Sequence, residues 1–231
     1  MTASRRETLL DTAYDRLERL YGTPVNHSPP APLDELIGAV LSQHTSDANS
    51  HRAFRSLIET LGPWDRVAKA DVEDVAIAIR SGGLANQKAP RIKEILGKVI
   101  ERSGGADLEW IRDATTDVVT DFLTSLPGVG PKTAACVILF SLGRGAFPVD
   151  THVHRLARRI GLVDEAASAA RVQAELELEV PEDKMFAYHV NLIRHGRRVC
   201  LARRPRCVEC PLTDVCRHYR EVVRPLEEAG D

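Results

Sequence analysis

Four of the five cysteines lie within seventeen residues near the C-terminal end of the sequence: Cys200, Cys207, Cys210 and Cys216. In an intracellular chain, such clustering is typical of a metal centre and not of disulfide bonds. Zinc sites usually use two close pairs of ligands, whereas only Cys207 and Cys210 form a close pair here. Iron–sulfur clusters also take four thiolates. The spacing alone therefore leaves zinc and iron–sulfur equally open.

The rest of the sequence has the pattern of helices. Apolar residues recur at helical spacing from Leu9 to Leu20, and Gly22 is predicted to end that helix. Similar patterns predict helices over residues 33–43, 47–61, 71–80, 87–102, 116–125, 131–142, 151–160, 165–180 and 183–194. The fifth cysteine, Cys136, falls in an apolar run and is predicted to be a buried, inert thiol. Residues 26–32 are proline-rich and predict a linker. We find no β-hairpin pattern, so the sequence predicts an all-α fold.

Length and charge set further bounds. A chain of 231 residues can form one large domain or two small ones, and no apolar run reaches the roughly 18–20 residues of a membrane span. The first residues lack the apolar core of a signal peptide, which predicts a cytosolic protein. The net charge of −2 gives no global argument for a nucleic-acid partner. The basic residues are clustered, however: six arginines and no acid lie between Arg194 and Arg206.

A glycine-rich segment joins two of the predicted helices. Gly128 and Gly130 predict a tight turn in which the backbone can approach a ligand closely. Pro131 suits the first position of the following helix, whose exposed N–H groups favour an anion such as a DNA phosphate. A glycine pair taken alone fits a plain turn between helices better than a binding site.

Lys132 and Asp150 are the candidate catalytic residues. Lys132 falls in the first turn of its helix, where the helix dipole disfavours a positive charge and so favours the nucleophilic neutral amine. The alternative is an ordinary surface lysine. Asp150 fits the N-cap of the helix over residues 151–160. At the edge of a cleft, the same carboxylate could stabilise positive charge on a sugar ring or activate the lysine.

In this order, these elements resemble the endonuclease III branch of the helix-hairpin-helix DNA glycosylases. The resemblance rests first on Leu126-Pro127-Gly128-Val129-Gly130-Pro131-Lys132-Thr133-Ala134, then on Val149-Asp150-Thr151-His152, and finally on His195-Gly196 followed by the four cysteines. Weaker similarity extends through residues 83–89 and 39–43, so that the match covers about 33–216. The sequence departs from the family at His44, where a glutamine is usual, and Gln43 or His44 is expected to act in its place.

The resemblance implies a fold and a set of sites. It implies a six-helix barrel with the hairpin over residues 25–144, an iron–sulfur domain made of 1–24 and 145–220, a tail over 221–231, and a DNA-binding groove between the domains. The four cysteines would bind a [4Fe-4S] cluster. Lys132 would be the nucleophile and Asp150 its essential carboxylate. The expected DNA contacts are Gln43, His44, Leu84, Gly128, Gly130, Thr133, His152, Arg203 and Arg204.

The resemblance also implies an activity. A monomer in the cytoplasm, associated with the nucleoid, would bind double-stranded DNA that contains damaged bases or abasic sites. It would flip out an oxidised pyrimidine, excise it and nick the strand by β-elimination. One alternative is a monofunctional mismatch glycosylase of the same fold, although such enzymes generally lack a lysine at the position of Lys132. Another is a noncatalytic DNA-binding protein, against which the presence of both Lys132 and Asp150 argues.

Overall fold

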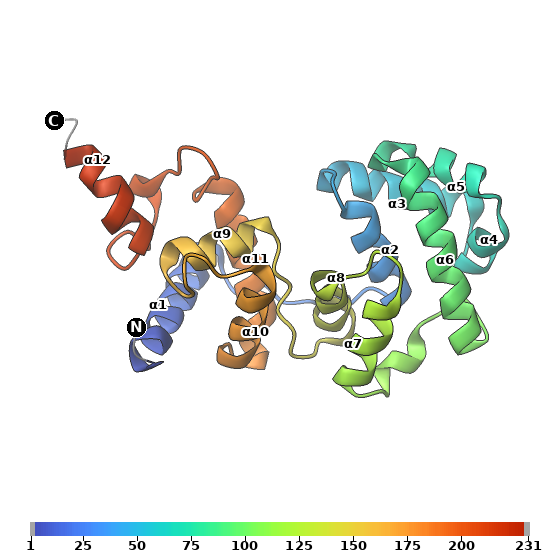
Figure 1. Ribbon diagram of the computed structural model, residues 1–231, viewed down its shortest axis with the longest axis horizontal. Helices are drawn as coiled ribbons and strands as arrows, with labels where there is room; N and C mark the ends of the chain where they lie inside the picture. The colour runs from blue at the N-terminus through green and yellow to red at the C-terminus, as the bar shows by residue number, and fades with distance from the viewer. Residues whose placement is uncertain (1–2, 229–231) are drawn as a thin grey trace. The chain divides into compact units, whose positions relative to one another are not determined.

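The computed structural model describes residues 3–228, which form helices and no strands. The all-α prediction is confirmed. The chain divides into two compact units: Ser28–Arg144 is one, and the residues up to His27 join those from Gly145 onward to form the other. No helix within residues 3–228 is long and apolar enough to cross a membrane. Figure 1 labels the helices of both units.

The unit Ser28–Arg144 contains the hairpin and is named here the hairpin unit. Its elements are α2 (Pro32–Ser42), α3 (Asp47–Leu61), α4 (Trp64–Lys69), α5 (Val72–Ala78), η1 (Arg80–Gly82), α6 (Ala85–Ser103), η2 (Glu109–Arg112), α7 (Thr116–Ser125), α8 (Pro131–Cys136) and η3 (Val137–Ser141). The apolar helix α2 packs against α3, α6, α8 and η3. Leu36, Ile37 and Val40 are fully buried there. Apolar burial of this extent is the main force that orders the unit.

In this unit one predicted helix is wrong in detail, and one short helix was not predicted. The single helix predicted over residues 131–142 is wrong in detail, because α8 passes into a short π-helix, η3, at Val137. The six-residue helix α4 was not predicted, since one and a half turns carry little periodic signal. Tertiary contact fixes α4 instead: Trp64 is buried, and its Nε1 donates to Asp34 Oδ1 at 2.7 Å.

The second unit, named here the cluster unit, combines segments far apart in the sequence. Its elements are α1 (Ala3–Tyr21), α9 (Thr151–Ile160), α10 (Ala169–Glu179), α11 (Glu182–Arg198), η4 (Cys207–Glu209), η5 (Tyr219–Val223) and α12 (Arg224–Glu228). The helix α11 packs against both α1 and α9, as can be followed in Figure 1. The fully buried ring of Tyr188 lies edge-on to Tyr14 and Phe147 in its core.

Helix boundaries in the cluster unit follow capping more closely than apolar spacing. The helix predicted from residue 165 begins at Ala169, because the Ser168 side chain accepts from Arg171 N and caps it. The helix predicted over 183–194 extends to Arg198. The predicted helix over 151–160 and its cap, Asp150, are confirmed.

Candidate functional site

The hairpin turn between α7 and α8 depends on two glycines with different roles. Gly128 has a φ of +71°, a conformation that L side chains rarely adopt. A Cβ built at Gly128 would lie 2.5 Å from Nε of Arg91, so a side chain there would have to displace the Arg91 guanidinium. Gly130 has a φ of −100°, and a Cβ there would meet nothing within 4 Å. The left-handed conformation therefore favours glycine at position 128, whereas Gly130 leaves open space beside the start of α8.

Gln43 binds the hairpin turn. Its Nε2 donates to Gly128 O at 3.0 Å, and its Oε1 accepts from an Arg91 guanidinium nitrogen at 3.1 Å. Both ends of the amide are therefore engaged within the hairpin unit. His44, the next residue, is exposed and has a φ of +55°. Of the two residues expected to read a lesion, His44 is the one whose side chain is exposed.

Lys132 is the second residue of α8 and is half-buried. Glu35 stands in the first turn of α2, the helix that packs against α8. Burial raises the pKa of the Glu35 carboxyl to about 7, and the positive charge of Lys132 opposes this rise. A carboxyl group and the candidate nucleophile thus interact within the hairpin unit.

Thr133 does not lie at the surface. Its residue is 5% exposed, and its backbone N–H donates to Gly130 O at 3.0 Å. The amide is therefore already bonded within α8. The role of Thr133 as a DNA contact stays a prediction.

Leu84 and a buried lysine lie at the start of α6. Leu84 is 46% exposed and adopts a left-handed conformation, φ +51°, which is unusual for a branched apolar residue. Lys88, one turn later, is 2% exposed, and its Nζ donates to Leu41 O at 2.7 Å and to Gly82 O at 2.9 Å. Burial lowers the pKa of Lys88, and Arg91 adds to this effect. Lys88 thereby joins the end of α2 to the segment that presents Leu84.

Asp150 belongs to the cluster unit and Lys132 to the hairpin unit. The Asp150 carboxylate caps α9: its Oδ1 accepts from His152 N at 2.9 Å and from Val153 N at 2.8 Å. Within residues 3–228, the other oxygen, Oδ2, makes no hydrogen bond. The cap predicted from the sequence is therefore real, and one carboxylate oxygen remains available for chemistry.

His152 lies where α9 and α11 meet. Its ring Nδ1 is 3.1 Å from an Arg155 guanidinium nitrogen, which also donates to Gly196 O at 2.8 Å. A Cβ at Gly196 would come within 2.9 Å of the His152 Cβ. Only glycine permits this approach, which gives a physical reason for the His195-Gly196 pair in the motif.

The four clustered cysteines line one small pocket of the cluster unit. Burial raises the pKa of Cys210 to about 12, and the neighbouring Cys216, Cys200 and Cys207 thiols add to this rise. Burial also raises the pKa of Cys216. Four thiols brought together in this way can become thiolates only when a cationic group compensates their charge. No three His, Cys, Asp or Glu side chains of residues 3–228 are grouped so as to hold a single metal ion.

Arginines of α9 hold the loop that carries these cysteines, residues 199–216, named here the cluster loop. Arg155 Nε donates to Cys200 O at 3.0 Å. Arg159 donates to Leu201 O at 2.7 Å and lies 3.5 Å from Cys200 Sγ. The basic side chains of the loop itself, Arg203, Arg204 and Arg206, are exposed. The loop is therefore anchored to α9 and presents three exposed arginines.

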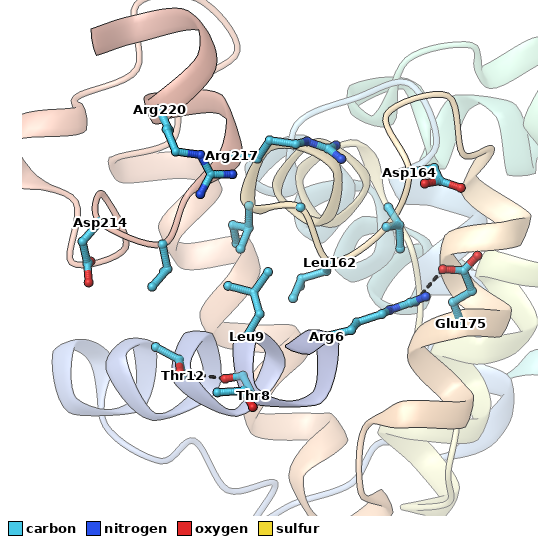
Figure 2. Close-up of a pocket in the computed structure, with 14 residues that line it drawn as sticks. Arg6, Thr8, Leu9, Thr12, Leu162, Asp164, Glu175, Asp214, Arg217 and Arg220 are labelled. Carbon is cyan, nitrogen blue, oxygen red and sulfur yellow. Dashed lines mark hydrogen bonds and ion pairs between the residues drawn. The ribbon is translucent and has the colours of Figure 1, made fainter. Parts of the chain in front are cut away.

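A larger pocket in the cluster unit contains none of these residues. Figure 2 shows that its walls are α1, the end of α9 and the segment around Arg217 and Arg220. Its acidic and basic side chains include ion pairs, of which Arg6–Glu175 is drawn. The pocket thus lies apart from the residues that the motifs single out.

Sequence reasoning missed three residues of the hairpin unit: Glu35, Lys88 and Arg91. Lys88 falls inside the segment 83–89 that carries part of the resemblance, but nothing in the pattern indicated that its ammonium is buried. Glu35 interrupts the apolar face of α2, and a charge on such a face is a usable signal. Arg91 gave no signal, since its contacts depend on the turn at Gly128.

Comparisons with known proteins identify the family of this chain. Residues 37–182 match the HhH-GPD superfamily of base excision DNA repair proteins, and residues 200–216 match the iron-sulfur binding domain of endonuclease III. Endonuclease III of Thermotoga maritima is 36% identical over 197 residues, which cover 85% of this chain and 88% of that protein. The chain belongs to the endonuclease III family. It is a base-excision-repair DNA glycosylase, and the cluster loop is its [4Fe-4S]-binding element.

Two further comparisons extend this result. A solved structure of a trapped endonuclease III–DNA covalent intermediate superposes with a TM-score of 0.82 at 28% identity, covering 97% of this chain and 100% of that one. An Arabidopsis thaliana protein named as a DNA glycosylase is 39% identical over 165 residues. That match covers 71% of this chain and 56% of the plant protein, so this chain spans little more than half of its length.

Proposed function

We propose that this endonuclease III family member removes oxidised pyrimidines and nicks the strand through a Schiff base at Lys132. The observation that carries the proposal is the position of Lys132. It is half-buried in the first turn of α8, directly after the glycine turn, in a unit whose half-buried Glu35 interacts with it. At this position the amine can act as a nucleophile toward a sugar carbon.

The reaction begins with the neutral amine of Lys132. It attacks the C1′ carbon of the sugar, and the bond to the damaged base breaks, so that the base leaves with the bonding electrons and takes up a proton. The nitrogen then loses one proton, and the C1′–O4′ bond of the sugar ring breaks as the iminium forms, with O4′ taking up a proton. Asp150 stabilises the positive charge on the sugar through Oδ2, or accepts a proton from Lys132, while Oδ1 keeps α9 capped. The two residues belong to different units.

Strand cleavage follows from the same iminium. Loss of a proton from C2′ is coupled to breakage of the C3′–O bond, which releases the strand on the 3′ side, and hydrolysis then frees Lys132. The [4Fe-4S] cluster, when bound, supplies a rigid cross-link between four thiolates. It would be held by Cys200, Cys207, Cys210 and Cys216, and it would fix the loop that presents Arg203 and Arg204.

We further propose how the chain binds damaged or abasic duplex DNA. Exposed Arg203 and Arg204 contact phosphates, and the open space beside Gly130 admits the backbone of one strand to the start of α8. Exposed Leu84 fills the gap left by the flipped base, His152 flanks it, and exposed His44 reads the opposite side. Gln43 supports DNA binding indirectly, because its hydrogen bond to the Gly128 carbonyl holds the hairpin turn. The protein acts as a monomer, in the compartment that contains the nucleoid.

A duplex with a single thymine glycol tests this function. Base release is measured from strand breaks after alkali, and lyase action from breaks without alkali. We expect both for the cluster-loaded protein and neither for Lys132→Ala. Asp150→Asn should unfold at the same temperature, because asparagine is an equally good N-cap, but lose most of its turnover. Base release without any strand breakage would instead identify a monofunctional glycosylase.

A further inference from the structure

A buried histidine of α11 contacts a cysteine of the cluster loop. The ring of His195 is 1% exposed, and its Nε2 lies 3.3 Å from Cys210 Sγ. On the other side of the ring, Nδ1 lies 3.1 Å from the hydroxyl of Tyr21. His195 therefore stands between a phenol and a sulfur that belongs to the cluster-binding set.

The two contacts determine which nitrogen carries the proton. The buried ring has no carboxylate partner within residues 3–228, and an imidazole with a single N–H carries it on either Nδ1 or Nε2. A cluster-bound thiolate can only accept a hydrogen bond, and this requires the proton on Nε2. Nδ1 is then an acceptor, and the Tyr21 hydroxyl donates to it. The chain Tyr21–His195–Cys210 thus has one self-consistent direction of donation.

Tyr21 is held firmly enough to fix this direction. It is the last residue of α1, and Arg194 of α11 donates to its carbonyl at 3.3 Å. The neighbouring Gly22 carbonyl accepts from Asn191 Nδ2 at 2.9 Å. The Tyr21 and His195 rings lie edge to face, with centroids 6.0 Å apart. The end of α1 is therefore bonded to the face of α11 that carries His195.

We propose that His195, oriented by Tyr21, donates a hydrogen bond to the Cys210 thiolate and thereby raises the reduction potential of the cluster and slows its loss. A donor to a ligating sulfur stabilises the more negative, reduced state. Tyr21 is a positioning residue: it acts only by keeping the proton on Nε2. The inference rests on the four-cysteine site and is independent of the lesion that the enzyme removes.

The test is the midpoint potential of the cluster in the purified, iron-loaded full chain, measured by protein-film voltammetry without DNA. His195→Phe removes the donor and should shift the potential to more negative values. His195→Gln, which keeps an N–H donor, should restore part of the shift. Tyr21→Phe should shift the potential in the same direction by less. Tyr14→Phe is the matched control, because Tyr14 lies on the same helix and bonds to Glu18 instead; it should leave the potential unchanged.

Cluster lifetime gives a second readout. Loss of visible absorption under a chelator should be faster in His195→Phe and Tyr21→Phe than in Tyr14→Phe. An unchanged potential in iron-loaded His195→Phe would overturn the inference. If that variant loads no iron, Tyr21→Phe decides: a potential and lifetime equal to those of the wild type would overturn it. Equal shifts in Tyr14→Phe and Tyr21→Phe would also overturn it, since they would reveal a general effect of loosening α1.

Discussion

The hairpin turn and the cluster loop are both short irregular segments, but different forces hold them. The hairpin turn lies against an apolar core, and its shape is set by Gly128, Gln43 and Arg91 without any cofactor. Within the cluster loop only Val199 and Leu212 are buried, and its backbone is held by arginines and by its four cysteines. The hairpin turn can therefore order as its unit folds, whereas the cluster loop needs its metal.

Of the changes considered, removal of the cluster should have the largest effect. It should disturb the cluster loop and leave the hairpin turn intact. We expect apo protein, or Cys207→Ala, to lose amide protection over the cluster loop and the adjoining ends of α9 and α11, because the four clustered cysteines lose the group that links them. Protection of α2 and α8 should stay unchanged. Hydrogen exchange with mass spectrometry measures both. Equal loss of protection in α8 would show that the hairpin unit also depends on the metal.

Glu35 should make the stability of the hairpin unit depend on pH. Its carboxyl has a pKa of about 7 in the folded protein against 4.5 as the ordinary value. The neutral form is favoured on folding, so stability is full below pH 4.5 and falls as pH rises towards 7, by about 3 kcal/mol in all. Glu35→Gln should therefore be more stable than the wild type at pH 8, with the difference vanishing near pH 4.

Urea unfolding across this pH range is the measurement for Glu35. Glu59→Gln, at an exposed position on α3, is the control and should track the wild type at every pH. The same control separates burial from a general effect of charge removal. A Glu35→Gln curve parallel to that of the wild type would show that the carboxyl does not titrate as its burial requires.

The two hairpin glycines allow folding and binding to be separated. Gly128→Ala forces a side chain into a left-handed conformation and against Arg91, and it should cost about 2 kcal/mol. Gly130→Ala enters open space at an ordinary φ and should keep wild-type stability while weakening DNA binding. Thermal unfolding and binding to an abasic-analogue duplex check the pair. Normal DNA binding by Gly130→Ala would show that the DNA backbone does not approach Gly130.

The smallest effects are expected at Arg203 and Arg204. Each exposed arginine that contacts a phosphate should contribute about 0.9 to the slope of log affinity against log salt. Arg203→Ala and Arg204→Ala should weaken binding to damaged and undamaged duplex alike. Arg102→Ala is the control, because its guanidinium packs over Trp110 in the hairpin unit. An effect confined to one lesion would contradict a role in phosphate contact.

Local features were readable from the sequence. The N-cap at Asp150 and the buried thiol of Cys136, which is 5% exposed, are confirmed. Both depend on residues a few positions apart. The sequence predicted a continuous α-helix where the π-helix η3 lies, and it predicted too early a start for α10. Tertiary packing and capping override apolar spacing at these two places.

The supporting contacts of the site could not be read in the same way. Gln43 and Gly128 are 85 positions apart, and Tyr21 and His195 are 174 apart. No local pattern records such pairs, since they form only when separate helices pack. The family resemblance supplied the catalytic and cysteine positions but gave no role to Glu35, Lys88 or Arg91. Those residues act through neighbours that only the fold brings close.

The central claim is that Lys132 is the nucleophile, and borohydride trapping tests it most directly. Borohydride reduces the iminium and freezes the bond between the lysine nitrogen and C1′. On a duplex with one oxidised pyrimidine, the account predicts a covalent protein–DNA adduct from the iron-loaded wild type and none from equally iron-loaded Lys132→Ala. An adduct of equal yield from Lys132→Ala, or none from the wild type on either this duplex or an abasic one, would contradict it.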